Sequence, residues 1–100
     1  MKIYISGPMT GIENNNYPAF ERAKNIIGKD AVSPHDIHEG ETDLSWSGYM
    51  KRDIKALMDC DAIVMLPGWS ASKGANIELS LARVLNFKVY LSVEDYLSQI

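Results

Sequence analysis

The sequence predicts an α/β protein built on an open parallel sheet of about four strands, with helices on both faces. Two observations predict this class. Short apolar runs alternate with segments of helical periodicity four times along the 100 residues. The run 62–66 is continuously apolar and ends at Pro67-Gly68, as expected of a strand buried on both of its faces.

Composition limits what this chain can be. One hundred residues, of which 46% are hydrophobic and 23% charged, suit one globular domain over residues 1–100. The net charge of −3 argues against binding a nucleic acid polymer, which depends on clustered Lys and Arg. The single cysteine, Cys60, excludes a disulfide framework. With no apolar run of membrane-spanning length and no signal-peptide pattern, we expect a cytoplasmic protein without membrane contact.

The first half of the chain gives two strands and two helices. Residues 2–6 are β-branched and aromatic, and a glycine-containing loop over 7–11 follows them. Asn16 is a candidate helix cap for residues 17–27, and Gly28 ends that helix. Residues 31–33 form a weak second strand, and 35–45 form a long polar loop. From Trp46 an apolar stripe predicts the second helix.

The second half repeats the pattern. The strand at 62–66 is followed by a loop of small and polar residues. Ile77, Leu81 and Leu85 then recur at helical spacing. Asn86 is a candidate end for that helix before the strand at 88–91. Ser92 caps a last short helix over 93–98.

Right-handed crossovers favour the strand order 2-1-3-4, a flavodoxin-like or Rossmann-like arrangement. In such sheets a ligand crevice opens at the carboxyl ends of the strands, where the direction of winding reverses. That point lies between the first and third strands. We therefore expect the loops at 7–11 and 68–74 to face each other across one cleft.

Glu78 is the residue most suited to chemistry in this cleft. It lies one turn into the third helix, where the positive end of the helix favours an ionised carboxylate. An anionic carboxylate can act as a nucleophile at the anomeric carbon of a sugar. The alternative is an acidic residue that only complements the helix dipole. The first interpretation predicts that Glu78 stays anionic at neutral pH.

Other candidate residues surround Glu78, each with a structural alternative. Ser72 and Gly74 are placed to hold a phosphate or a sugar hydroxyl, or else form a plain capping loop. The Tyr4 hydroxyl is placed to orient a carboxylate, or else Tyr4 is a core residue whose hydroxyl finds a hydrogen-bond partner at the edge of the core. Trp69 is placed to stack on a base or to cover the core.

The sequence offers no support for a cofactor or a metal. It contains neither G-x-G-x-x-G nor G-x-x-x-x-G-K-[ST], so neither a dinucleotide fold nor a P-loop is indicated. His35, Asp36, His38 and Glu39 fit no zinc spacing with a second ligand pair, and a solvated loop is the default interpretation. We therefore expect no cofactor and no metal.

The chain resembles the nucleoside 2-deoxyribosyltransferase superfamily along nearly its whole length, in particular the small members common in bacteriophages and prophages. The segments that carry the resemblance are 4–11 (YISGPMTG), 17–20 (YPAF), 60–63 (CDAI), 66–69 (LPGW) and 72–78 (SKGANIE). The last segment is similar to the nucleophile motif of that superfamily. The resemblance implies that Glu78 is the nucleophile and that Tyr4 contacts it.

The same resemblance separates two branches. True transferases have an aspartate at the position of Ser72. A serine at this position is similar to the 2′-deoxynucleoside 5′-phosphate N-hydrolases, in which it helps to bind the 5′-phosphate. Asn76 replaces a residue that is usually small and is expected to narrow the pocket. The substrate-binding residues implied are Ser6, Gly7, Pro8, Met9, Trp69, Ser72, Gly74 and Ala75.

These features predict N-glycosidic bond cleavage or deoxyribosyl transfer on a small nucleoside or nucleotide, through a glutamate nucleophile. The alternative is a nucleotide-binding protein without catalysis, with a sequestering or regulatory role. Because the superfamily completes its sites with a neighbouring chain, a homodimer or larger homo-oligomer is expected. Met50 and Met58 on the second helix exceed the apolar surface that one side of a small sheet needs.

Overall fold

Four parallel strands form the sheet in the computed structural model, which describes residues 1–38 and 45–100. Their order is β2-β1-β3-β4, and β1 pairs with β3 in the register Ile3 to Ala62 and Ser6 to Met65. This confirms the predicted fold class, strand order and adjacency of the first and third strands. The bounds are β1 (Ile3–Ser6), β2 (Ala31–Val32), β3 (Ala62–Met65) and β4 (Lys88–Tyr90).

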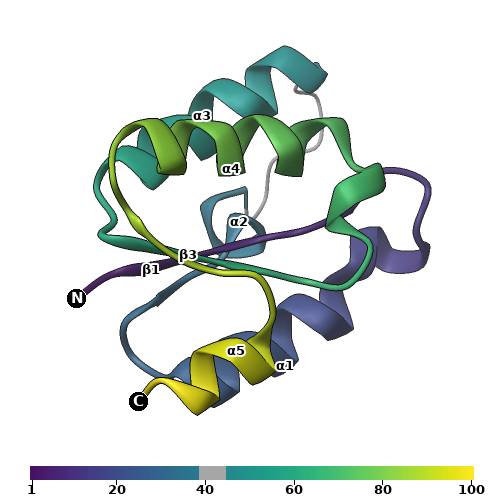
Figure 1. The fold of residues 1–100 in the computed structure, drawn as a ribbon. Coiled ribbons are helices and arrows are strands. Elements are labelled where there is room, and N and C mark those ends of the chain that lie inside the picture. The colour runs from purple at the N-terminus through teal and green to yellow at the C-terminus, as the bar shows by residue number, and fades with distance from the viewer. Residues whose placement is uncertain (39–44) are drawn as a thin grey trace.

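Helices cover both faces of the sheet (Figure 1). On one face lie α1 (Tyr17–Ile27) and α5 (Val93–Ser98), and on the other lie α3 (Trp46–Met58) and α4 (Lys73–Val84). Three short elements complete the order: η1 (Glu13–Asn16), α2 (Pro34–Ile37) and η2 (Trp69–Ala71). Within residues 1–38 and 45–100, no helix has the length and apolar character needed to cross a membrane.

Strand β1 supplies both faces of the core because alternate side chains point to opposite sides. Ile3 and Ile5 pack with Phe20 of α1 and Tyr96 of α5. Tyr4 packs on the opposite side, in a cluster whose buried members also include Leu57, Cys60, Ile63, Met65, Ala75, Leu79 and Ala82. Every residue of the strand is buried.

Serine hydroxyl groups start four of the helices. The Oγ of Ser92 accepts the backbone N–H of Asp95, as predicted, and Ser33, Ser45 and Ser72 cap α2, α3 and α4 in the same way. Asn16 is the N-cap residue of α1, as predicted, but its side chain makes no capping hydrogen bond. It has left-handed backbone angles, and its Nδ2 donates to the carbonyl of Pro8.

Three further expectations need correction. The buried stripe of α4 consists of Ala75, Leu79 and Ala82 with Glu78, whereas Ile77 and Leu81 are only partly buried and Leu85 is exposed. Met50 is buried within the domain, so of these two methionines only Met58 is exposed on α3. The predicted polar loop at 35–45 overlaps the four-residue helix α2, and its remainder at 39–44 lies outside the described residues.

Candidate active site

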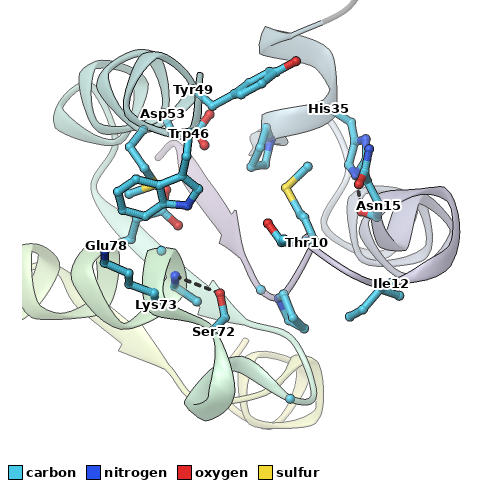
Figure 2. A pocket seen from close by; sticks show the side chains of 18 of the residues that line it. Thr10, Ile12, Asn15, His35, Trp46, Tyr49, Asp53, Ser72, Lys73 and Glu78 are labelled. Carbon is cyan, nitrogen blue, oxygen red and sulfur yellow. Dashed lines mark hydrogen bonds between the residues drawn. The ribbon is translucent and has the colours of Figure 1, made fainter. Parts of the chain in front are cut away.

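A cleft of about 880 Å³ opens at the carboxyl ends of β1 and β3. This volume falls in the usual range for small-molecule sites. Its walls come from the loop after β1, the loop after β3, the start of α4 and one side of α3 (Figure 2). The two loops that were expected to share one cleft therefore do so.

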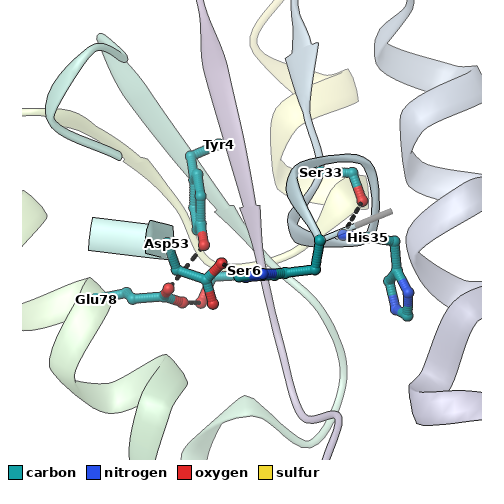
Figure 3. Close-up of polar contacts among 7 residues, drawn as sticks. Tyr4, Ser6, Ser33, His35, Asp53 and Glu78 are labelled. Atoms are coloured by element: carbon teal, nitrogen blue, oxygen red, sulfur yellow. Dashed lines mark hydrogen bonds and ion pairs between the residues drawn. The ribbon is translucent and has the colours of Figure 1, made fainter. Parts of the chain in front are cut away.

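Glu78 lies in the wall of this cleft and is held by two hydroxyl groups (Figure 3). The hydroxyl of Tyr4 donates to Glu78 Oε2 at 2.7 Å, and the hydroxyl of Ser6 donates to Glu78 Oε1 at 2.7 Å. Tyr4 and Ser6 can both reach the same carboxylate because they stand two residues apart on β1 and point to the same face. All three side chains are buried, so the orientation of the carboxylate is fixed by its neighbours.

The electrostatics of Glu78 differ from the sequence expectation. Glu78 is the sixth residue of α4, beyond the first turn where the helix dipole acts most strongly. Burial raises its pKa to about 7, while the hydrogen bonds from Ser6 and Tyr4 oppose that rise. At neutral pH the carboxyl is therefore divided between its protonated and ionised forms, which corrects the prediction of a fully anionic group.

Asp53 is a second carboxyl group in the same cleft, and the sequence analysis missed it. It lies on α3, is buried, and burial raises its pKa to about 7. Its charge also raises the pKa of Glu78, so the two carboxyls are electrostatically coupled (Figure 3). The signal was present in the sequence: Asp53 lies between Met50 and Leu57 on the apolar stripe of the helix, where a carboxylate has no reason to be buried unless it is used.

The side chain of His38 contacts that of Asp53. Its Nε2 lies 2.5 Å from Asp53 Oδ1, and both side chains are largely buried. His38 also lines the cleft. Two adjacent carboxyls, one held by hydroxyl groups and the other by an imidazole, make this end of the sheet the most polar part of the described interior.

The loop after β1 brings Gly7, Pro8 and Met9 to the cleft, as the sequence predicted. Glycine is needed at position 7 for packing, because a Cβ there would lie 2.8 Å from the Cβ of Leu66. Ser6 precedes them but contacts Glu78 instead of lining the cleft. Its place in the site is therefore to hold the carboxylate.

The start of α4 brings Ser72, Lys73, Gly74 and Ala75 to the opposite wall. The backbone N–H of Ala75 donates to Ser72 Oγ, so that hydroxyl caps the helix (Figure 2). A Cβ on Gly74 would lie 3.1 Å from the sulfur of Met50, so glycine lets α3 and α4 approach closely. Asn76 does not narrow the cleft: it is exposed and its Nδ2 donates to the carbonyls of Ser70 and Ser72.

Trp69, predicted among the substrate-binding residues, does not line the cleft, whereas Trp46 does. Trp69 packs against the apolar cluster around Tyr4 and is absent from the described lining of the cleft, so its ring covers the core. Trp46, the first residue of α3, lines the cleft instead. The ammonium of Lys73 lies 4.5 Å from the centre of the Trp46 ring, a cation–π contact between α3 and α4.

The histidine region contains no metal-binding arrangement within residues 1–38 and 45–100, where no three His, Cys, Asp or Glu side chains gather. His35 lines the cleft, and its Nε2 lies 3.0 Å from the carbonyl oxygen of Asn15 (Figure 2). Burial lowers the pKa of His35, so its ring is neutral at pH 7. Glu39, the fourth residue of the candidate group, lies outside the described residues.

The chain matches the model of a protein family. The model of a family described as "Domain of unknown function (DUF4406)" matches residues 1–91 of the chain. This range includes all four strands, both loops of the cleft and every cleft residue named above. No curated protein matches the chain.

Proposed function

The chain belongs to the DUF4406 family, and we propose that it is an enzyme acting on 2′-deoxynucleosides or their 5′-monophosphates. It would cleave the N-glycosidic bond or transfer the deoxyribosyl group to a second base. The observation that carries this proposal is the carboxylate of Glu78, which two hydroxyl groups hold in the wall of a cleft. A carboxylate oriented in advance loses little freedom when it attacks an electrophilic carbon.

The resemblance of residues 72–78 to a nucleophile motif supports C1′ of the sugar as that carbon. In the first step a Glu78 oxygen forms an ester bond to C1′ while the bond from C1′ to the base nitrogen breaks. The electron pair of the broken bond goes to the base. The negative charge of Glu78 stabilises the oxocarbenium-like transition state.

Asp53 supplies the proton that the departing base needs. Its raised pKa keeps a fraction of the carboxyl protonated at neutral pH, which a general acid requires. In the second step water attacks C1′, Asp53 takes back a proton, and Glu78 leaves as a carboxylate. When a second base attacks in place of water, the result is deoxyribosyl transfer.

The start of α4 suits the phosphate end of a nucleotide. Ser72, Lys73 and Gly74 combine a helix start with an ammonium group, which favours an anion such as a 5′-phosphate. The ammonium of Lys73 lies over the ring of Trp46, so we assign both side chains to this end of the cleft. This arrangement supports the monophosphate as the preferred substrate.

The proposal includes a homodimer or larger homo-oligomer. Val84 at the end of α4 and Leu85 just after it are 76% and 48% exposed, and Ile77 and Leu81 on the same helix are only partly buried. A second copy of the chain would cover this apolar surface. Light scattering at micromolar concentration should give at least twice the chain mass, and a monomeric mass would contradict this part of the proposal.

The direct test is release of free base from a panel of 2′-deoxynucleosides and their 5′-monophosphates, followed by chromatography. We expect turnover of at least one compound. Glu78→Gln keeps the shape of the side chain but loses its charge and nucleophilicity, so its rate should fall by about 10³-fold or more, roughly 4 kcal/mol at the transition state. Binding of the nucleotide should change little.

Glu94→Gln is the matched control, because Glu94 is exposed on α5 and lies outside the cleft. Its rate should equal that of the wild type. Wild-type turnover by Glu78→Gln would assign Glu78 a structural role. Binding of a deoxynucleotide without turnover by any variant would establish the non-catalytic nucleotide-binding protein instead.

A further inference from the structure

His38 and Asp53 form a buried pair, and each of the two side chains is held by the element that carries it. His38 Nε2 lies 2.5 Å from Asp53 Oδ1, and the two side chains are 8% and 9% exposed. Asp53 comes from the middle of α3, whereas His38 immediately follows α2. The contact therefore joins two elements that are separate in the sequence and places an imidazole behind the carboxyl.

The imidazole is held in this orientation by its surroundings. The ring of His38 meets the ring of Tyr49 edge to face, with centroids 4.6 Å apart. Tyr49 lies four residues before Asp53 on α3, so both contact points are on the same face of one helix. On the other side the backbone N–H of His38 donates to the carbonyl of Pro34, which fixes His38 to α2.

The short helix α2 is itself anchored. Ser33 is buried, and its Oγ accepts the backbone N–H of His35, which starts the helix. Ser33 directly follows β2, the strand beside β1. A chain of contacts thus runs from the sheet through Ser33 and α2 to the imidazole, and the ring has little freedom to move away from Asp53.

Fixing one oxygen of a carboxyl determines what the other can do. In the tautomer of His38 that carries its proton on Nε2, this N–H donates to Oδ1, so Oδ2 becomes the oxygen that carries the proton of the neutral acid. Asp53 lines the cleft in which Glu78 lies. When the proton leaves Oδ2, the carboxylate that forms keeps a hydrogen bond from His38, which stabilises it without any rearrangement.

We propose that His38 is a positioning residue that orients the Asp53 carboxyl to protonate the departing base, an inference that rests on the function proposed above. The proton passes from Asp53 Oδ2 to a ring nitrogen of the base as the C1′–N bond breaks and the electron pair moves to that base. The water that later attacks C1′ returns a proton to Asp53. His38 donates a hydrogen bond throughout and is unchanged at the end.

A purely structural role for His38 makes a different prediction. If the pair only tied α2 to α3, its loss would reduce the rate for every substrate equally and would add to the loss of Asp53. If His38 acts through Asp53, its loss should matter only when the base needs a proton. It should also have no further effect once Asp53 can no longer provide one.

The experiment uses His38→Phe, which keeps a ring against Tyr49 but removes the donor, and His38→Gln, which restores an N–H at a similar distance. Rates are measured with 2′-deoxyguanosine 5′-monophosphate and with its N7-methyl form, whose positively charged base leaves without a proton. We expect His38→Phe to lose about 10- to 100-fold on the first substrate and less than about 3-fold on the second. His38→Gln should recover most of the loss.

A double-mutant cycle with Asp53→Asn applies the same test to whichever substrate the enzyme turns over best. The double variant His38→Phe/Asp53→Asn should be no slower than Asp53→Asn alone. Additive losses, or equal losses on both guanine substrates, would overturn the positioning role while leaving Glu78 as the nucleophile. Circular dichroism confirms that each variant is folded. Absence of wild-type turnover on every substrate would overturn the proposed function and this inference together.

Discussion

The two faces of the sheet differ in what they bury. On the face covered by α1 and α5, strand β1 contributes Ile3 and Ile5 to a cluster whose buried members are all hydrophobic. On the face covered by α3 and α4, the same strand contributes Tyr4 and Ser6, whose hydroxyl groups donate to a buried carboxylate. One strand of four residues thus builds an apolar core on one side and a polar site on the other.

This difference separates stability from function. An apolar cluster gains free energy from removing its surface from water. A buried carboxyl loses hydration, and this loss raises the pKa of Glu78 and of Asp53. Because apolar residues would stabilise the same positions better, we infer that the polar face is kept for chemistry. Substitutions on the two faces should therefore act on different measurements.

The largest effect on stability is expected from Phe20→Ala on the apolar face. Phe20 is fully buried against β1 and α5, so its removal leaves a cavity and should lower the free energy of unfolding by about 3–5 kcal/mol. Chemical denaturation measures this change. The rate per folded molecule should stay near the wild-type value, and a loss of activity greater than the loss of folded protein would break the separation of the two faces.

Glu78→Gln on the polar face should act on stability with the opposite sign. Below about pH 4 the carboxyl is protonated in the folded and unfolded states, so wild type and variant should be similarly stable. Between about pH 4.5 and 7 only the unfolded state loses its proton, so the unfolding free energy of the wild type falls as the pH rises. Above that window the variant should be more stable by about 3 kcal/mol.

Denaturation of both proteins at several pH values tests this expectation, with Glu94→Gln as the exposed control. A difference between wild type and Glu78→Gln that does not change from pH 4 to 8 would show that burial does not disfavour the charged form of Glu78.

The smallest effect is expected from Tyr4→Phe, which removes one donor to Glu78 and little packing volume. The hydrogen bond favours the ionised carboxylate, so its loss should raise the pKa of Glu78 further. The rising limb of the pH–rate profile should then move to higher pH, and the rate at pH 7 should fall about tenfold, equivalent to 1.4 kcal/mol. An unchanged pH–rate profile would show that the Tyr4 hydroxyl does not hold the nucleophile.

The sequence predicted the fold well because each strand and long helix carries a local signal. The apolar run before Pro67 and the stop at Gly28 are such signals, and the parallel crossover rules then left few topologies. The burial of α4 was harder to predict because two stripes share the helix. The larger residues Ile77 and Leu81 suggested the core face, but the close approach of α3 favours the small residues Ala75 and Ala82 there.

The site was predicted only in part. The two loops and the contact of Tyr4 with Glu78 followed from strand order and from resemblance. Asp53 was missed although its place on the apolar stripe of α3 was a local signal. Its contact with His38 could not be predicted, because it depends on where the four-residue helix α2 lies against α3, and no local pattern specifies that. The pKa of Glu78 was also misjudged, since burial depends on the packed structure and outweighs the helix dipole.

The most direct test of Glu78 as the nucleophile is detection of its ester with the sugar. A 2′-fluorinated arabinosyl analogue of the best substrate slows both steps, because fluorine destabilises the oxocarbenium-like transition state. After an acid quench, mass spectrometry of the digested protein should find the added sugar on the peptide that contains Glu78, and Glu78→Gln should carry none. Base release in a single turnover with no adduct, or with the adduct on Asp53, would contradict the assignment.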